Sequence, residues 1–146
     1  MKLKISTPSN IVYEGEVDTV TLPTESGNIT IWAGYVPMVT SVKPGIISIQ
    51  AHPYLPHDTY VSTSKGMAFV DGKIVRIVSA EATLNPIEDT ETLHQIKNDL
   101  EQRIAVLKTT GSVEEIEHTI DKLEKVIADI QLKQMENGTW RMENDR

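Results

Sequence analysis

Few side chains in this sequence have the types and spacing that chemistry requires. His52 and His57 flank a proline-rich segment with Asp58 alongside, and this is the one arrangement that suggests a metal site. Without a further ligand to complete the set that zinc requires, we expect solvated loop histidines. The other two histidines, His94 and His118, stand singly and are expected to face water. The chain has no cysteine, which excludes disulfides, thiolate nucleophiles and zinc–thiolate centres.

Three carboxylates, Glu14, Glu16 and Asp18, alternate along one segment and would share one face of a strand. Paired carboxylates can act as general acid and base, but a solvated sheet face is the interpretation we prefer. The sequence contains no Walker phosphate loop, no GxGxxG after a strand and no GxSxG nucleophile elbow. We therefore expect no catalytic residues, no metal and no cofactor, and a function that is not enzymatic.

Charge and hydropathy exclude two further classes of protein. The formal net charge of -7 over 146 residues argues against nucleic-acid binding, because phosphate affinity comes mainly from Lys and Arg. No apolar run approaches the roughly 20 residues of a membrane-spanning helix. The first ten residues, MKLKISTPSN, lack the apolar region of a secretory signal, so we expect the chain to stay in the compartment where it is made.

The chain changes character near residue 84, which predicts two structural parts. Six basic and seven acidic residues precede this point, and eight basic and 14 acidic residues follow it. Glycine and proline also thin out in the second part. We expect a β-sandwich of short strands over residues 1–84, an antiparallel helical hairpin over 85–136 and a flexible tail over 137–146. The fold class is therefore mainly β plus α.

Turn residues delimit the strands of the first part. The longest expected strand, Val12 to Leu22, changes its apolar phase, which predicts a bulge near Asp18 and Thr19 because a period-2 strand cannot shift phase without an extra residue. The Asp71-Gly72 pair suits a two-residue type I′ hairpin turn. The other expected strands are Ile29–Trp32, Val39–Val42, Ile46–Gln50, Thr59–Ser62, Met67–Val70 and Lys73–Val78. Strands this short and closely spaced are typical of a sandwich or barrel.

Two amphipathic stripes predict the helices of the second part. The first recurs at spacings of three and four from Leu93 to Leu107, and the second does so from Val113 to Ile130. Between them, Gly111 suits a left-handed C-cap of the first helix, and Ser112 with Glu115 forms a capping box for the second. So short a loop makes the helices antiparallel neighbours.

The order of several short motifs resembles the epsilon subunit of rotary F-type ATP synthases, over nearly the whole chain. The matching segments are Pro23-Thr24, Gly27-Asn28, Ile29–Trp32, Gly34–Met38, Lys43–Ile46, Lys65-Gly66, Phe69-Val70, Asp71–Lys73 and Ile77–Ala82. No single segment is specific, whereas their order and spacing together are.

The resemblance implies a non-catalytic rotor subunit of the central stalk. Its partners would be the gamma subunit, the c-ring and, with the hairpin extended, the alpha and beta subunits. It would couple ion-driven rotation to ATP synthesis and inhibit ATP hydrolysis through its helices. It would reach the membrane only through the complex, at the cytoplasmic face of a bacterial inner membrane or the stromal face of a thylakoid. The expected interfaces are Gly27, Asn28 and Ile29 for the c-ring, and Thr7, Tyr35, Val36, Pro37, Met38 and Thr40 for gamma.

Three positions depart from the pattern of that family. Tyr35 stands where the family has histidine, and Asn28 stands where it has an acidic ring contact. The ATP-binding motif is degenerate at Ile87, Glu88 and Glu91, because Glu91 carries the opposite sign to the expected arginine. We expect no physiological ATP binding, and micromolar affinity by calorimetry on the isolated chain would contradict this.

Two other functions remain open on the sequence alone. One is a sandwich that binds a sugar or peptide and dimerises through a coiled-coil hairpin. Such a module needs an exposed aromatic platform, for which Trp32, Tyr35 and Tyr54 are the candidates. The other is a small hydrolase, which the absence of catalytic motifs disfavours.

Overall fold

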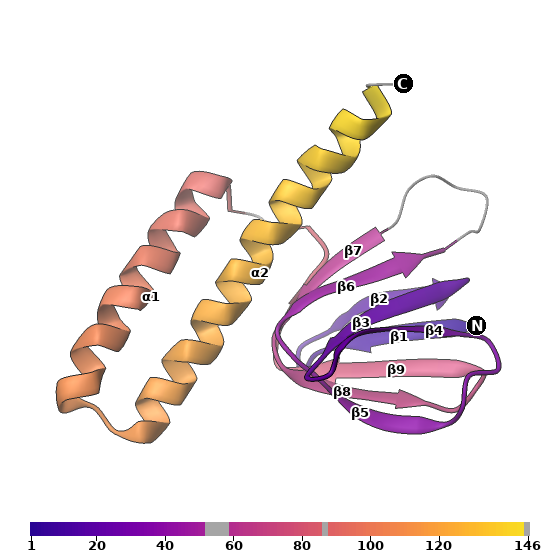
Figure 1. Cartoon of the computed structure of the whole chain (residues 1–146), viewed down its shortest axis with the longest axis horizontal. Coiled ribbons are helices and arrows are strands. Elements are labelled where there is room, and N and C mark those ends of the chain that lie inside the picture. Colours follow the sequence, from indigo (N-terminus) through magenta and orange to yellow (C-terminus); the bar gives the residue numbers. More distant parts are fainter. Residues whose placement is uncertain (52–58, 86–87, 145–146) are drawn as a thin grey trace.

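The computed structural model describes residues 1–51, 59–85 and 88–144, with side chains described as far as Met135. It confirms the predicted fold class, because ten strands in two sheets are followed by two helices (Figure 1). Four residues weighed above as metal or aromatic candidates, and one from the degenerate ATP motif, lie outside the described part of the chain. They are His52, Tyr54, His57, Asp58 and Ile87.

Sheet A consists of five strands in the order β2-β1-β9-β8-β5. The strands are β1 (Lys2–Ser6), β2 (Ile11–Glu16), β5 (Met38–Val42), β8 (Gly66–Val70) and β9 (Ile74–Ser79). Neighbours run antiparallel except β1 and β9, which are parallel with Leu3 opposite Val75. Sheet A therefore joins the beginning of the sandwich sequence to its end.

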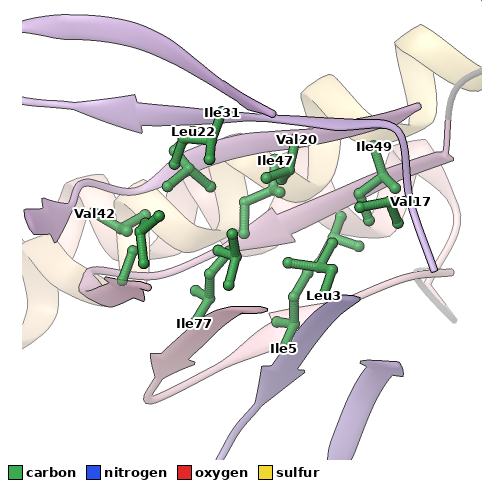
Figure 2. Packing of buried hydrophobic residues seen from close by; sticks show 14 residues of the cluster. Leu3, Ile5, Val17, Val20, Leu22, Ile31, Val42, Ile47, Ile49 and Ile77 are labelled. Atoms are coloured by element: carbon green, nitrogen blue, oxygen red, sulfur yellow. The ribbon is translucent and has the colours of Figure 1, made fainter. Parts of the chain in front are cut away.

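Sheet B consists of five antiparallel strands in the order β10-β7-β6-β3-β4. The strands are β3 (Thr19–Thr24), β4 (Gly27–Trp32), β6 (Gly45–Gln50), β7 (Thr59–Thr63) and β10 (Ala82–Thr83). Aliphatic side chains from both sheets point into the space between them and exclude water from it (Figure 2). The labelled core includes Leu3, Ile5 and Ile77 from sheet A and Val20, Leu22, Ile31, Ile47 and Ile49 from sheet B. Each such side chain contributes about 1.5–3 kcal/mol by burial.

The predicted strand from Val12 to Leu22 is wrong, because the chain changes sheets at Val17 and Asp18. β2 ends at Glu16 in sheet A, and β3 begins at Thr19 in sheet B. The Val17 N–H donates to the Met1 carbonyl at 2.8 Å, and the Asp18 N–H donates to the Gln50 carbonyl at 2.7 Å. The phase change in the sequence thus marks a corner between two sheets and not a bulge within one.

The turn between β8 and β9 also differs from the expected type. Gly72 has a φ of +91°, but its neighbour Lys73 does not have a positive φ. A type I′ turn needs two positive φ values, and neither Asp71 nor Lys73 has one, so the predicted turn type is wrong. Asp71 supports the turn by accepting from the N–H groups of Lys73 and Ile74, and these bonds lower the pKa of the Asp71 carboxyl.

The helices are α1 (Thr90–Thr110) and α2 (Val113–Asn144). The loop between them differs in part from the predicted caps. Gly111 has a φ of -93° and is extended, so the predicted left-handed C-cap is wrong. A glycine suits this position for another reason, because a Cβ here would lie 2.6 Å from Leu107 Cδ2. The Ser112 hydroxyl accepts from the Glu115 N–H at 3.2 Å, which is the N-cap half of a capping box.

Helix α2 continues well past the point where its apolar stripe ends. The sequence predicted a loose tail from residue 137, whereas the structure continues the helix to Asn144. The segment contains no proline to stop a helix, and its one glycine only weakens it. Figure 1 shows α2 lying between α1 and the sandwich, with its C-terminal end projecting beyond the sheets. The main contacts of α2 with the sandwich are to β6 and β7 of sheet B.

Candidate partner-binding surfaces

The outer face of sheet A carries a continuous apolar patch that the sandwich leaves uncovered. We name it the apolar face and define it by Val39, Met67, Phe69 and Val78. Val39 lies opposite Phe69 between β5 and β8, and Met67 lies opposite Val78 between β8 and β9. Val39 is 62% exposed and Phe69 is 38% exposed. Clustered exposed aliphatic and aromatic side chains of this kind are typical of surfaces that bind a partner.

Basic residues border the apolar face on the side of β9 and β1. Arg76 is opposite Phe69 in the register, and Lys4 is opposite Arg76 on the next strand. Arg76 is exposed and Lys4 is partly exposed, in a chain whose net charge is -7. An apolar centre with a charged rim is the usual composition of a protein–protein interface.

The residue pattern of β8 and β9 is a sequence signal for the apolar face. β8 alternates buried and exposed positions, yet both sets are apolar, with Ala68 and Val70 buried and Met67 and Phe69 exposed; on β9 the exposed Val78 continues this pattern. An antiparallel sheet with one solvated face shows polar residues at every second position. Apolar residues at both sets of positions therefore predict that the outer face of sheet A is covered as well as the inner face.

The structure spreads the predicted gamma contacts over several places. Tyr35, Val36 and Pro37 belong to the β4–β5 loop, where the Val36 side chain is strongly exposed. Met38 and Thr40 alternate with the exposed Val39, so they lie on the inner side of edge strand β5 and not on the apolar face. Thr7 follows β1 and bonds to Asn10 in a turn. The Tyr35 ring packs edge-on against Trp32 with 5.0 Å between ring centroids.

The predicted ring contacts lie together at the start of β4. Gly27 has a φ of +106°, a backbone conformation that favours glycine over other residues. The Thr24 hydroxyl donates to the Gly27 carbonyl at 2.5 Å. Asn28 is exposed, whereas Ile29 is partly buried against the core. β4 separates this site from the Tyr35 loop by about 20 Å, given about 3.3 Å per residue. The predicted ring contacts and the Tyr35 loop therefore lie at opposite ends of one strand.

Asn28 also lines an open groove of about 650 Å³ between the sandwich and α2. The Lys43-Pro44-Gly45 turn forms one wall, and Gln131, Gln134 and Met135 of α2 form the other. The docked hairpin therefore contributes side chains to the surroundings of the predicted ring contact.

The three carboxylates that we expected to lie on a solvated sheet face are exposed and are not arranged for catalysis. Glu14 and Glu16 lie exposed on edge strand β2, where Glu14 is 3.9 Å from the Lys2 ammonium. Asp18 lies beyond the sheet corner and is also exposed. Among the side chains of residues 1–51, 59–85 and 88–135, no group of three or more His, Asp or Glu is placed to hold a metal ion.

The segment that the resemblance matched to a degenerate ATP motif forms the start of α1. Asp89 is the N-cap, and its carboxylate accepts from the Thr92 N–H at 2.7 Å. Hydrogen bonds from Thr92 hold the pKa of the Asp89 carboxyl below its ordinary value of 3.8. Glu88 and Glu91 are exposed on either side of it.

We expect the Thr92 amide signal to titrate with Asp89. A carboxyl with a lowered folded-state pKa stabilises the fold above its unfolded pKa, and this contribution is lost as the pH falls through the folded value. The cap should therefore weaken only below pH 3.8. NMR of the Thr92 amide against pH measures the midpoint, and Asp89→Asn, which still accepts but does not titrate, should abolish the large step. A midpoint at or above 3.8 would contradict the capping role.

Polar side chains join α2 to the sandwich in a cluster that the sequence did not reveal. Lys125 Nζ donates to Asp129 Oδ1 at 2.7 Å and to Thr83 Oγ1 at 2.9 Å. The Ser62 hydroxyl donates to the same Asp129 carboxylate. We name Ser62, Thr83, Lys125 and Asp129 the polar clasp. The only signal in the sequence was an i,i+4 Lys–Asp pair on the side of α2 away from its apolar stripe.

Comparisons with known proteins agree with this geometry. A family model described as "ATP synthase, Delta/Epsilon chain, beta-sandwich domain" matches residues 1–85, which is more than half of the chain. The chain belongs to the ATP synthase delta/epsilon chain family. The matched segment contains all ten strands and the whole apolar face, so the resemblance noted in the sequence is confirmed.

Individual relatives extend the likeness into the hairpin. An ATP synthase epsilon chain of Rickettsia bellii is 32% identical over 101 residues, which cover 68% of this chain and 90% of that protein. The epsilon chain of Campylobacter jejuni subsp. doylei is 30% identical over 112 residues, covering 77% of this chain and 83% of its own. A chain in the cryo-EM structure of the Euglena gracilis mitochondrial ATP synthase shares the fold with a TM-score of 0.68 at 19% identity, covering 86% of this chain and 76% of that one.

Family membership gives the broad role. Epsilon chains are structural and regulatory subunits of a proton-transporting ATPase. Membership of this family confirms the expectation of a non-catalytic chain. Neither α1 nor the described length of α2 is apolar enough over a long enough stretch to cross a bilayer.

Proposed function

We propose that the chain forms part of the rotor and binds the gamma subunit through the apolar face of sheet A. The observation that carries this proposal is the uncovered patch of Val39, Met67, Phe69 and Val78 within the family's sandwich domain. A stalk subunit must stay bound to a neighbour that rotates with it. An apolar patch with a basic rim suits such a permanent contact. The loop at Tyr35, Val36 and Pro37 would extend this contact along the edge of β5.

The c-ring would meet the opposite end of the sandwich, at Gly27, Asn28 and Ile29. Asn28 is exposed there and can donate and accept hydrogen bonds, but it supplies no charge. With gamma bound to sheet A and the ring at the start of β4, the sandwich would transmit ion-driven rotation toward the sites of ATP synthesis. Membrane association would then come only through the ring, at the cytoplasmic face of a bacterial membrane or the stromal face of a thylakoid.

The proposal divides the chain into three functional parts. Residues 1–84 would serve the stalk and ring contacts, residues 85–136 would form the regulatory hairpin, and residues 137–146 would form a terminal extension. An extended hairpin would reach the alpha and beta subunits and inhibit ATP hydrolysis. Glu91, exposed in the first turn of α1, supports a hairpin whose position does not depend on bound ATP.

Copurification from native membranes tests the assignment. Tagged full-length chain should recover alpha, beta, gamma and ring subunits, as identified by mass spectrometry. Recovery of the chain alone would overturn the proposal. In that case the exposed Trp32 beside Tyr35 would favour the second candidate, a sugar- or peptide-binding module, whose dimerisation can be checked by light scattering.

A further inference from the structure

One register row crosses all five strands of sheet A on its outer face. Val39 on β5 is opposite Phe69 on β8, which is opposite Arg76 on β9. Arg76 is opposite Lys4 on β1, which is opposite Glu14 on β2. We name these five residues the cross-sheet row. Their chemistry changes in order across the sheet, from two apolar side chains through two cations to one carboxylate. The hairpin lies against sheet B and leaves the row exposed or partly exposed (Figure 1).

The two cations in the cross-sheet row lie side by side. Neighbouring strands are about 4.8 Å apart, so the Arg76 and Lys4 side chains leave the same face close together. Like charges at such positions repel each other. Among the side chains of the described residues, no carboxylate lies within 4.0 Å of either cation, and Glu14 is 3.9 Å from the Lys2 ammonium instead. A carboxylate placed between Arg76 and Lys4 would therefore stabilise both.

Asp71 is near this site but is committed to another role. Its carboxylate accepts hydrogen bonds from the N–H groups of Lys73 and Ile74 in the β8–β9 turn. These two bonds lower the pKa of the Asp71 carboxyl more than the charge of Arg76 does. The carboxylate that would stabilise Arg76 and Lys4 is therefore expected on the molecule that covers the apolar face.

We propose that Arg76 and Lys4 together bind a carboxylate of gamma, and that this contact fixes the position of gamma on the apolar face. The inference rests on the proposed function, because it names the chemistry of the gamma surface that the apolar face would bind. The planar guanidinium of Arg76 can hold both oxygens of a carboxylate, and the Lys4 ammonium adds a second charge. Charge complementarity of this kind contributes to orientation and association rate.

The cross-sheet row also predicts the spacing of residues on gamma. From Phe69 to the midpoint between Arg76 and Lys4 is one and a half strand spacings, about 7 Å. Two residues four positions apart on one helix are separated by about 6 Å along its axis. A gamma helix that crosses the strands would thus place an apolar residue on Phe69 and an Asp or Glu, four positions away, over the two cations.

Glu14 gives the cross-sheet row a direction. A gamma carboxylate displaced towards β2 would meet Glu14, which repels it, and one displaced towards β5 would lie over Phe69, which offers it no hydrogen bond. Both displacements are unfavourable, so one position of gamma is favoured. The apolar residues alone would not select this position, because the hydrophobic effect has no direction.

Zero-length crosslinking tests the contact in the unmodified chain. A carbodiimide joins a lysine amine to a carboxylate that lies against it, forming an amide while the carbodiimide takes up the water that is lost. The full-length chain would be bound to an alpha–beta–gamma complex prepared without it. We expect an amide between Lys4 and an Asp or Glu of gamma, identified by mass spectrometry. Coupling of Lys4 to Glu14 within the chain gives a product of different mass.

Charge reversal measures how much the contact contributes to binding. Arg76→Glu should weaken binding to the same complex by about thirtyfold or more at low salt. Arg76→Lys, which keeps the charge and loses the planar fork, should lie between Arg76→Glu and the parent chain. The matched control is Arg103→Glu, which makes the same change at an exposed position of α1 and should bind like the parent chain.

Salt and stability show whether charge is the cause. The difference between Arg76→Glu and the parent chain should shrink as the ionic strength rises from about 0.01 to 1 M, because the Debye length falls from about 30 to 3 Å. The Tm of free Arg76→Glu should not fall, because the substitution places opposite charges on β9 and β1 in place of like charges.

The outcomes separate failure of the inference from failure of the proposed function. If the parent chain does not bind the complex, the stalk role fails and the inference fails with it. If the parent chain binds but Lys4 gives no product with gamma, or if Arg76→Glu binds as tightly as Arg103→Glu, the inference is overturned and the stalk role stands. A loss of affinity that does not change with salt would also overturn the inference, since charge would not be its cause.

Discussion

Replacing Phe69 by aspartate should abolish copurification with gamma while leaving the sandwich folded. The Phe69 side chain lies at the centre of the apolar face, between Val39 on β5 and Arg76 on β9. In a formed interface the new carboxylate would be buried without a matched partner. We expect affinity for gamma to fall by about a hundredfold or more, as at the central residues of protein interfaces.

The free chain should tolerate this change because Phe69 is already 38% exposed. Circular dichroism and thermal melting would verify that the fold persists. Phe69→Leu, which keeps an apolar side chain, should retain most of the gamma recovered with the parent chain.

A matched control places the same charge on the other sheet. Thr30 is exposed on β4 in sheet B, where its hydroxyl bonds to Thr21. Thr30→Asp should recover gamma at the parental level. If Phe69→Asp and Thr30→Asp recover gamma equally, the apolar face is not the gamma interface.

Replacing Gly66 by alanine should destabilise the sandwich strongly. A Cβ at this position would lie 2.2 Å from the Val78 carbonyl oxygen and 3.0 Å from Ser79 Cα. Both atoms belong to the backbone of β9, so no side-chain rotation can relieve the clash. We expect a loss of about 3 kcal/mol, at the upper end for overpacking substitutions, and a drop in Tm on the order of 10 °C.

The same sheet supplies the control for that experiment. A Cβ on Gly15 in β2 would come no closer than 3.8 Å to the Tyr13 side chain, which is ordinary contact. Gly15→Ala should therefore melt close to the parent chain in differential scanning calorimetry. Equal melting temperatures for the two variants would show that β9 can shift to accommodate a side chain at residue 66.

Gly66 illustrates what the sequence could and could not predict. Its place in a Lys-Gly motif was recognisable, but the cause, a close approach of two backbones, needs the partner strand. Gly111 was assigned to a left-handed cap because glycine is common there, whereas the structure uses it to avoid the Leu107 side chain. The local sequence pattern shows that a glycine is required, but it does not show which contact requires it.

Strands and helices were predictable wherever a single periodicity determined them. The aliphatic stripes identified both helices, and turn residues separated most strands. The corner at Val17 and the parallel pairing of β1 with β9 were not predictable, because both depend on contacts between distant segments. The polar clasp was not predictable for the same reason, because its residues come from three distant elements, β7, β10 and α2.

The parallel pairing of β1 with β9 also constrains the order in which the chain can fold. One side of β1 has no strand partner until residues 74–79 are present, so sheet A closes late and across almost the whole domain. Contacts of such long range form slowly, whereas the two helices join residues that are near in sequence and form quickly. During synthesis the slow unit is made first and the fast one last. The hairpin can therefore be complete while sheet A is still closing, which suits a part that forms without the rest.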